Sequence, residues 1–128
     1  FLSSLPTLKS LKQRVERAAN KEYLKGLDGR KIYVRHRHAS LNTLLQGGGA
    51  IVMKKAMCIL QELINLNTLD AKFVANIHDE WQLQVKESQA DCVGRLGVSS
   101  IRKAGLHFNM RCPLTGEYKI GGNWSETH

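Results

Sequence analysis

The stretch from about Ser40 to Leu66 repeats apolar side chains at helical spacing, and its length constrains the fold more than any other feature of the sequence. Apolar residues at i, i+3, i+4 and i+7 gather on one face of a helix. The members of this series are Leu41, Leu44, Leu45, Val52, Met53, Ala56, Leu60, Leu63 and Ile64. We therefore predict one long helix in the middle of the chain.

Three consecutive glycines, Gly47 to Gly49, lie inside this stretch. Each glycine in a helix costs about 1 kcal/mol relative to alanine. Either the helix breaks at the triplet, or something approaches the backbone so closely that a Cβ atom would clash. The sequence alone leaves both interpretations open.

Shorter elements precede the long helix. Apolar residues at helical spacing, with basic residues between them, predict an amphipathic helix from about Pro6 to Lys25, with Ser3 or Ser4 as its cap. A hairpin is predicted over residues 24–34, because Asp28-Gly29 at its centre is typical of a tight turn that needs positive φ.

The second half of the sequence predicts another hairpin and another helix. Residues 72–77 and 81–85 have strand character and form the hairpin, and a helix follows from about residue 88 to Ala104. A last extended stretch covers residues 107–110 and then 118–124. This order of elements predicts an α+β fold, an antiparallel sheet with helices on one face.

The formal net charge is +8, and the positive surplus lies in the first 55 residues. Twelve lysines and arginines stand against three acids between Lys9 and Lys55, whereas the remainder has seven against eight. A basic half indicates a polyanionic partner, DNA or RNA first and an acidic membrane surface second. A solvated basic face without a partner is the alternative.

Cysteine usage bears on the compartment. Cys58, Cys92 and Cys112 have neither CxxC spacing nor histidines at zinc-ligand spacing, which argues against a disulfide scaffold and a structural zinc site and favours a reducing cytoplasm. No apolar run approaches the roughly 20 residues of a membrane span, and the start lacks the pattern of a signal peptide. Because the sequence begins with Phe1, we expect a removed start residue or, more readily, a segment upstream.

His78-Asp79-Glu80 places three polar, ionisable residues at the tip of the second predicted hairpin. Carboxylates on a tight turn are held rigidly and supply the oxygen ligands that Mg²⁺ prefers. Two-metal phosphoryl transfer needs carboxylates placed in this way. The alternative is a solvated acidic turn, since turns favour aspartate for backbone reasons of their own.

His38, Asn42 and Gln46 are spaced i, i+4 and i+8 and would form one polar stripe on a helix. Minor-groove acceptors are nearly the same for every base pair, so donors on this stripe could follow duplex geometry without reading sequence. An ordinary exposed helix face is the alternative. Lys54 and Lys55 suit phosphate contact and plain solvation equally well.

Several ordered motifs together resemble the end of the family-A, or polymerase I type, DNA polymerases, and the resemblance is strongest to the replicative enzymes of short-tailed phages. It spans nearly the whole chain in order and spacing. The motifs are Leu24-Lys25-Gly26-Leu27-Asp28-Gly29-Arg30-Lys31, Val34-Arg35, Leu41-Asn42-Thr43-Leu44-Leu45-Gln46, Val74-Ala75-Asn76-Ile77-His78-Asp79-Glu80, and Gly122-Asn123-Trp124 with the terminal His128.

The resemblance implies roles for the second hairpin and for the end of the chain. His78-Asp79-Glu80 matches the family's motif C, so Asp79 would bind the catalytic Mg²⁺ ions, Glu80 would lie beside them and His78 would support the geometry at the primer end. Trp124 and His128 match a C-terminal segment that folds back beside the active site, where packing is the expected role of His128.

The resemblance also implies DNA contacts and subdomains. His38, Asn42 and Gln46 match the helix that follows the minor groove of the primer-template, and Arg30, Arg35 and Lys54 are expected to contact DNA as well. Residues 1 to about 35 resemble part of the fingers, and residues from about 36 to 128 resemble the palm of a right-hand polymerase.

Two family motifs have no counterpart in these 128 residues. Motif A carries the other metal-binding aspartate, and motif B carries the arginine and lysine that hold the incoming deoxynucleoside triphosphate. We therefore expect an upstream polypeptide as partner, a two-Mg²⁺ site completed by its aspartate, and no polymerisation by this chain alone. The expected location is the cytoplasm, that of the host if a phage encodes the chain.

Two other functions remain open on the sequence. A duplex-binding module without catalysis would use the basic half for phosphate contacts and would not depend on Asp79. A free-standing metal-dependent nuclease is a third possibility, although only one hairpin supplies carboxylates. We also expect that the unpaired edge of the sheet lets the isolated chain self-associate.

Overall fold

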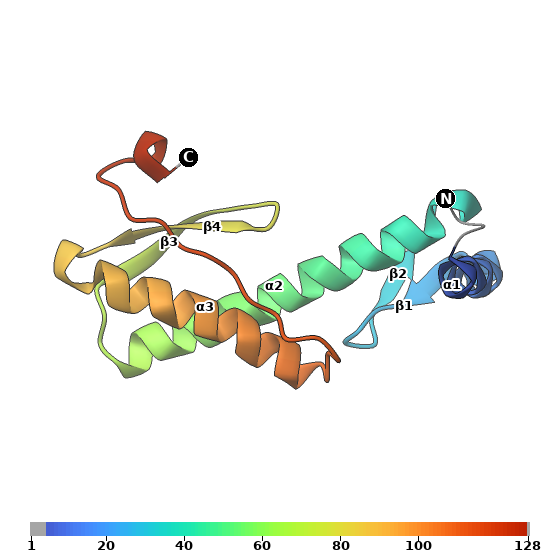
Figure 1. Cartoon of the computed structure of the whole chain (residues 1–128), viewed down its shortest axis with the longest axis horizontal. Coiled ribbons are helices and arrows are strands. Elements are labelled where there is room, and N and C mark those ends of the chain that lie inside the picture. The colour runs from blue at the N-terminus through green and yellow to red at the C-terminus, as the bar shows by residue number, and fades with distance from the viewer. Residues whose placement is uncertain (1–4, 128) are drawn as a thin grey trace. The chain divides into compact units, whose positions relative to one another are not determined.

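The computed structural model describes residues 5–127, which form helices and two short antiparallel hairpins (Figure 1). The helices are α1 (Pro6–Ala18), α2 (Ser40–Leu66) and α3 (Ala90–His107); the strands are β1 (Tyr23–Lys25), β2 (Lys31–Tyr33), β3 (Ala71–Ile77) and β4 (Glu80–Val85). The α+β class is as predicted. In the described part, the antiparallel pairing comes as two separate two-stranded sheets, β1-β2 and β3-β4.

By its internal contacts the chain divides into two compact units, Phe1–Ile51 and Val52–His128. The first unit has a small apolar core, in which Val15, Ala19 and Leu24 are buried. Half-buried residues that pack around this core are Val34, Leu41 and Leu44. The core thus joins α1, the β1-β2 hairpin and the start of α2.

The first helix is shorter than its periodicity predicts. It ends at Ala18, a 3₁₀ turn follows over Ala19–Lys21, and Glu22 with φ 64° turns the chain into β1. The prediction of a helix to Lys25 was wrong because β1 pairs with β2 instead. Its N-cap position is occupied by Leu5, and the predicted caps, Ser3 and Ser4, lie outside the described residues.

The glycine triplet does not interrupt α2, which begins and ends where the sequence predicts. A Cβ atom on Gly47 would lie 2.8 Å from Cδ1 of Ile32 in β2, and one on Gly48 would lie 3.8 Å from Cδ1 of Leu27. Around Gly49 there is nothing within 4 Å. Close approach is therefore the correct interpretation at Gly47, where the first hairpin rests on the helix.

The second unit is built from the C-terminal part of α2, the β3-β4 hairpin and α3. Its two buried clusters share the ring of Trp81 at their edges. Their buried members are Leu60, Ile64, Ala71 and Val93 in one, and Val52, Ala56 and Ala104 in the other. The hairpin is therefore anchored on two helices through one face.

The last helix and the tail differ from the prediction. Gly105 does not end α3, which continues to His107; a Cβ atom on this buried glycine would lie 3.0 Å from Cγ of Leu114. The predicted terminal strand is absent from the described residues. The segment after α3 instead runs back along that helix, and a 3₁₀ turn follows at Trp124–Thr127 (Figure 1). Among the described residues, no helix has the length and apolar character needed to cross a membrane.

Candidate functional site

His78 and Asp79 form the two-residue turn between β3 and β4. Ile77 pairs with Glu80, so the pairing of the two strands continues up to the turn. His78 has φ 55°, a left-handed conformation that costs a non-glycine residue about 1 kcal/mol. A turn this short allows few backbone conformations, so it fixes where the Asp79 side chain leaves the backbone.

The hairpin below the turn is fixed by packing. The ring of Phe73 lies edge-on to that of Trp81, with 5.9 Å between centroids, and both rings pack on the core of the second unit. The register shifts between Phe73 and Ala75, so Val74 is an extra, bulged residue that is 68% exposed. The tip therefore projects into solvent from a well-packed base.

Two carboxylates lie at this tip. Asp79 is exposed, and its carboxylate makes no hydrogen bond or ion pair with the described residues. Glu80 accepts a hydrogen bond on Oε1 from Nε2 of Gln82. Within residues 5–127 no group of three or more His, Cys, Asp or Glu side chains could hold a metal ion. The turn thus offers oxygen ligands for Mg²⁺ without completing a site.

The polar stripe lies at the start of α2. Asn42 and Gln46 are one helical turn apart and exposed. His38 precedes the helix, in the 3₁₀ turn Arg37–Ala39. Its side chain is 93% exposed, with Nδ1 3.9 Å from Oε1 of Glu16. His38 thus lies just before the predicted and observed helix, and only Asn42 and Gln46 of the stripe are on it, but all three side chains are exposed.

The basic residues expected to contact DNA differ in how free their charges are. Arg30 donates from Nε to Oδ2 of Asp28 at 2.8 Å, and its Nη2 lies 2.7 Å from the same oxygen. These hydrogen bonds hold the pKa of Asp28 below its ordinary value. Arg35 and Lys54 are exposed and have no ion pair within the described part of the chain.

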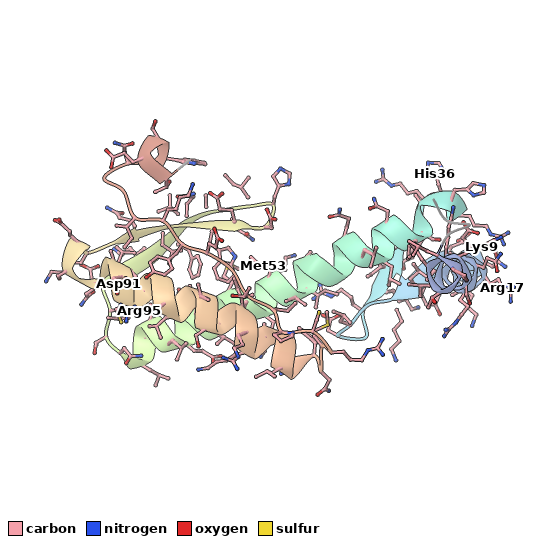
Figure 2. All side chains as sticks on the ribbon, viewed as in Figure 1. Lys9, Arg17, His36, Met53, Asp91 and Arg95 are labelled. Atoms are coloured by element: carbon pink, nitrogen blue, oxygen red, sulfur yellow. The ribbon has the colours of Figure 1, made fainter. Side chains whose placement is uncertain are left out.

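A polar cluster that the sequence did not reveal fixes the C-terminal segment on α3. Tyr118 donates from its hydroxyl to Oδ1 of Asp91 at 2.6 Å, and Nη2 of Arg95 lies 2.8 Å from Oδ2 of Asp91. Asp91 and Arg95 are labelled on α3 in Figure 2. The Tyr118 hydrogen bond and the Asp91 charge raise the pKa of Arg95. The i, i+4 spacing of Asp91 and Arg95 is visible in the sequence, but the contact of Asp91 with Tyr118 is not.

The end of the chain forms a compact turn. Glu126 accepts hydrogen bonds from the backbone N–H of Gly122 at 2.6 Å and from Nδ2 of Asn123 at 3.0 Å. Trp124 begins the 3₁₀ helix there and is exposed. His128 lies outside the described residues, so its predicted packing role stays a prediction.

Comparison with known proteins gives a consistent result. The sequence model of DNA polymerase family A matches residues 1–126. The whole chain aligns with the DNA-directed DNA polymerase of Escherichia phage Phieco32 at 38% identity, over 22% of that protein. It also aligns in full with the DNA-directed DNA polymerase of Enterobacteria phage T3 at 33% identity, over 21% of that protein. This chain belongs to DNA polymerase family A.

More distant similarities extend to a bacterial sequence and to a solved structure. The DNA polymerase I of Pseudomonas aeruginosa is 28% identical over 87% of this chain and 13% of its own length. Among solved structures, the POL domain of Pol1 from M. smegmatis, in complex with DNA primer-template and dNTP, superposes with a TM-score of 0.67 at 23% identity. That match covers 75% of this chain and 19% of the solved one, and it shows a shared fold.

Membership of family A confirms the resemblance from which the site residues were assigned. The chain spans about a fifth of the length of the phage polymerases that it matches. The individual roles of Asp79, Glu80 and His78, and those of the polar stripe, stay predictions.

Proposed function

We propose that this chain contributes the motif C carboxylate, Asp79, and a helix that follows the minor groove, α2, to a DNA-directed DNA polymerase. Family membership supports the proposal. So does one structural observation, an exposed carboxylate without a partner in the described chain, at the tip of a two-residue turn on a packed hairpin.

In this proposal each residue at the turn has a separate role. Asp79 would hold Mg²⁺, and Glu80, kept in place by Gln82, would lie beside it. His78 sets the direction of the turn through its left-handed backbone conformation. When bound, the metal ions supply Lewis acidity, which stabilises the charge that develops on the transferred phosphoryl group and favours the ionised form of the attacking hydroxyl.

One aspartate on one hairpin is not enough for this chemistry. Two metal ions need more oxygen ligands than Asp79 and Glu80 provide, and the described residues contain no larger cluster. We therefore include in the proposal an upstream polypeptide, which supplies the second aspartate and the cationic residues that hold the triphosphate. Without it, the 128 residues do not polymerise DNA.

The DNA contacts follow from the exposed donors. His38, Asn42 and Gln46 would bind the minor-groove acceptors of the primer-template near the insertion site. Arg35 and Lys54 would meet phosphates, and Arg30 less so because Asp28 already neutralises it. In this arrangement residues 1 to about 35 belong to the fingers and the rest to the palm. The enzyme would act in the cytoplasm, that of the host for a phage protein.

Substitution of Asp79 tests the proposal directly. In a primer-extension assay with Mg²⁺, deoxynucleoside triphosphates and the upstream polypeptide, Asp79→Asn should lower the rate on the order of 10³-fold, because a ligand to the metal is lost. Asp70→Asn, at the opposite end of the same hairpin, is the matched control and should retain the rate. Full activity of Asp79→Asn, or no extension by the unmodified mixture, would refute the proposal.

The basic first half of the sequence also supports a second function, duplex binding without catalysis. In that case the logarithm of the affinity for duplex DNA falls with the logarithm of the salt concentration, with a slope of about 0.9 for each phosphate contacted. Asp79→Asn leaves this affinity unchanged. Cleavage of DNA by the isolated chain would instead identify a nuclease.

A further inference from the structure

The β1-β2 hairpin carries an unusual set of side chains on its outer face. In the antiparallel register, Tyr23 lies opposite Tyr33 and Lys25 lies opposite Lys31. Side chains two residues apart on a strand point to the same face, so these four residues share one side of the hairpin. We call this set the hairpin face.

The other side of the hairpin fixes this orientation. Leu24 is 5% exposed in the apolar core of the first unit, and Cδ1 of Ile32 occupies the space that side chains on Gly26 and Gly47 would need. Because Leu24 and Ile32 point inward, their neighbours on each strand must point outward. The hairpin face therefore cannot turn into the core without the loss of this packing.

Two features of the hairpin face disfavour the folded state when nothing is bound to it. Tyr33 leaves 73% of its surface in water. Lys25 and Lys31 are directly opposed like charges, which destabilise a strand pair, and neither forms an ion pair with a described residue. An anion bound over the face would relieve the repulsion, and a flat partner would cover the ring.

The cations and the rings are also interleaved. Tyr23 is half-buried, and Nζ of Lys31 lies over its ring, 4.7 Å from the centroid, so this tyrosine holds a positive charge on the hairpin face. Arg35 follows β2 and is exposed, while the nearby acid Asp28 is already paired with Arg30. An exposed aromatic ring, here that of Tyr33, beside lysines is the combination that binds unpaired bases and their phosphates.

We propose that the hairpin face binds single-stranded nucleic acid, with a base stacked on the exposed ring of Tyr33 and phosphates held by Lys25 and Lys31. Unpaired bases offer free ring faces for stacking, whereas a duplex keeps them inside its helix. An acidic peptide would satisfy the lysines and leave the ring of Tyr33 unused. In templated synthesis the template ahead of the primer is unpaired, so the proposed function supplies such a ligand. The binding itself requires neither Asp79 nor catalysis.

Binding of a fluorescein-labelled dT12 oligonucleotide to the full chain, followed by fluorescence anisotropy at low salt, tests this proposal. Tyr33→Ala should weaken binding by about tenfold or more, because one stacked base is lost. Tyr33→Phe keeps the ring and should bind within about twofold of the unchanged chain. Lys25→Gln and Lys31→Gln should each reduce the salt slope by about 0.7. Lys103→Gln, an equal charge change on α3, is the control and should preserve dT12 affinity.

Three results would overturn the proposal. The unchanged chain would fail to bind dT12, or Tyr33→Ala would bind as well as the unchanged chain, or an oligoglutamate of equal charge would bind as tightly and with the same dependence on Tyr33. Asp79→Asn separates this proposal from the catalytic one. It should leave dT12 binding intact even where primer extension is lost.

Discussion

At the scale of single residues, the structure explains several side chains through what they touch and a few through what they lack. Ser40 and Ser100 are both completely buried, one in each unit. The Ser100 hydroxyl donates to the carbonyl oxygen of Leu96 at 2.7 Å, whereas the Ser40 hydroxyl has no hydrogen-bond partner among residues 5–127. A buried polar group without a hydrogen bond loses its interactions with water and gains nothing in return.

This pair gives a prediction with an internal control. Ser40→Ala should raise the free energy of unfolding by about 1 kcal/mol, because it removes an unsatisfied hydroxyl. Ser100→Ala should lower it by about 1 kcal/mol, because it removes a hydrogen bond. Urea denaturation followed by tryptophan fluorescence measures both. A loss of stability in Ser40→Ala would show that its hydroxyl has a partner after all.

At the scale of elements, three identical residues of the long helix α2 differ in their surroundings. Gly47, Gly48 and Gly49 are indistinguishable by propensity. Only Gly47 has a side chain of another element, that of Ile32, inside the space of a Cβ atom. The β1-β2 hairpin can rest on α2 because this one position has no side chain.

Alanine substitutions separate the effect of helix propensity from the effect of the contact with Ile32. Gly49→Ala should raise the free energy of unfolding by about 1 kcal/mol, because alanine is the better helix former and its Cβ atom meets open space. Gly47→Ala should stabilise less or should destabilise, because its Cβ atom would displace Ile32. Thermal denaturation of both variants measures the difference. Equal stabilisation by both variants would show that the β1-β2 hairpin can move away from a Cβ atom at residue 47 without loss of stability.

The same scale shows how much of the candidate site was predictable. The second hairpin and the limits of α2 follow from local patterns, and the structure reproduces them, except that Glu80, predicted at the tip, is the first residue of β4 and pairs with Ile77. The 3₁₀ turn that holds His38 and the pairing of Arg30 with Asp28 were not predicted. The 3₁₀ and α-helical turns share nearly the same side-chain spacing, and the ion pair depends on how the loop folds.

At the scale of the whole molecule, unpaired strand edges are the main liability. Both sheets in the described part have two strands, and β3 exposes the bulged Val74 beside its ladder. An apolar side chain on an open edge favours pairing with another copy of the chain. We therefore expect the chain to self-associate as its concentration rises.

Lysine at the bulge should reduce this association. Val74→Lys should shift the concentration-dependent elution in size-exclusion chromatography toward the monomer, because a charge at a strand edge opposes pairing. Leu106→Lys is the matched control, since Leu106 on α3 is 67% exposed and Val74 is 68% exposed. An equal shift in both variants would show that general solubility, rather than the strand edge, is responsible.

The amino-acid sequence by itself determined the long helix, both hairpins and membership of DNA polymerase family A. Each of these depends on residues that lie close together in the sequence, or on motifs that follow one another in the order typical of the family. The tertiary structure decided where α1 ends, why Gly47 must lack a side chain, and how Tyr118 holds the tail to Asp91. These features depend on atoms that meet only after folding, and no local pattern encodes such contacts.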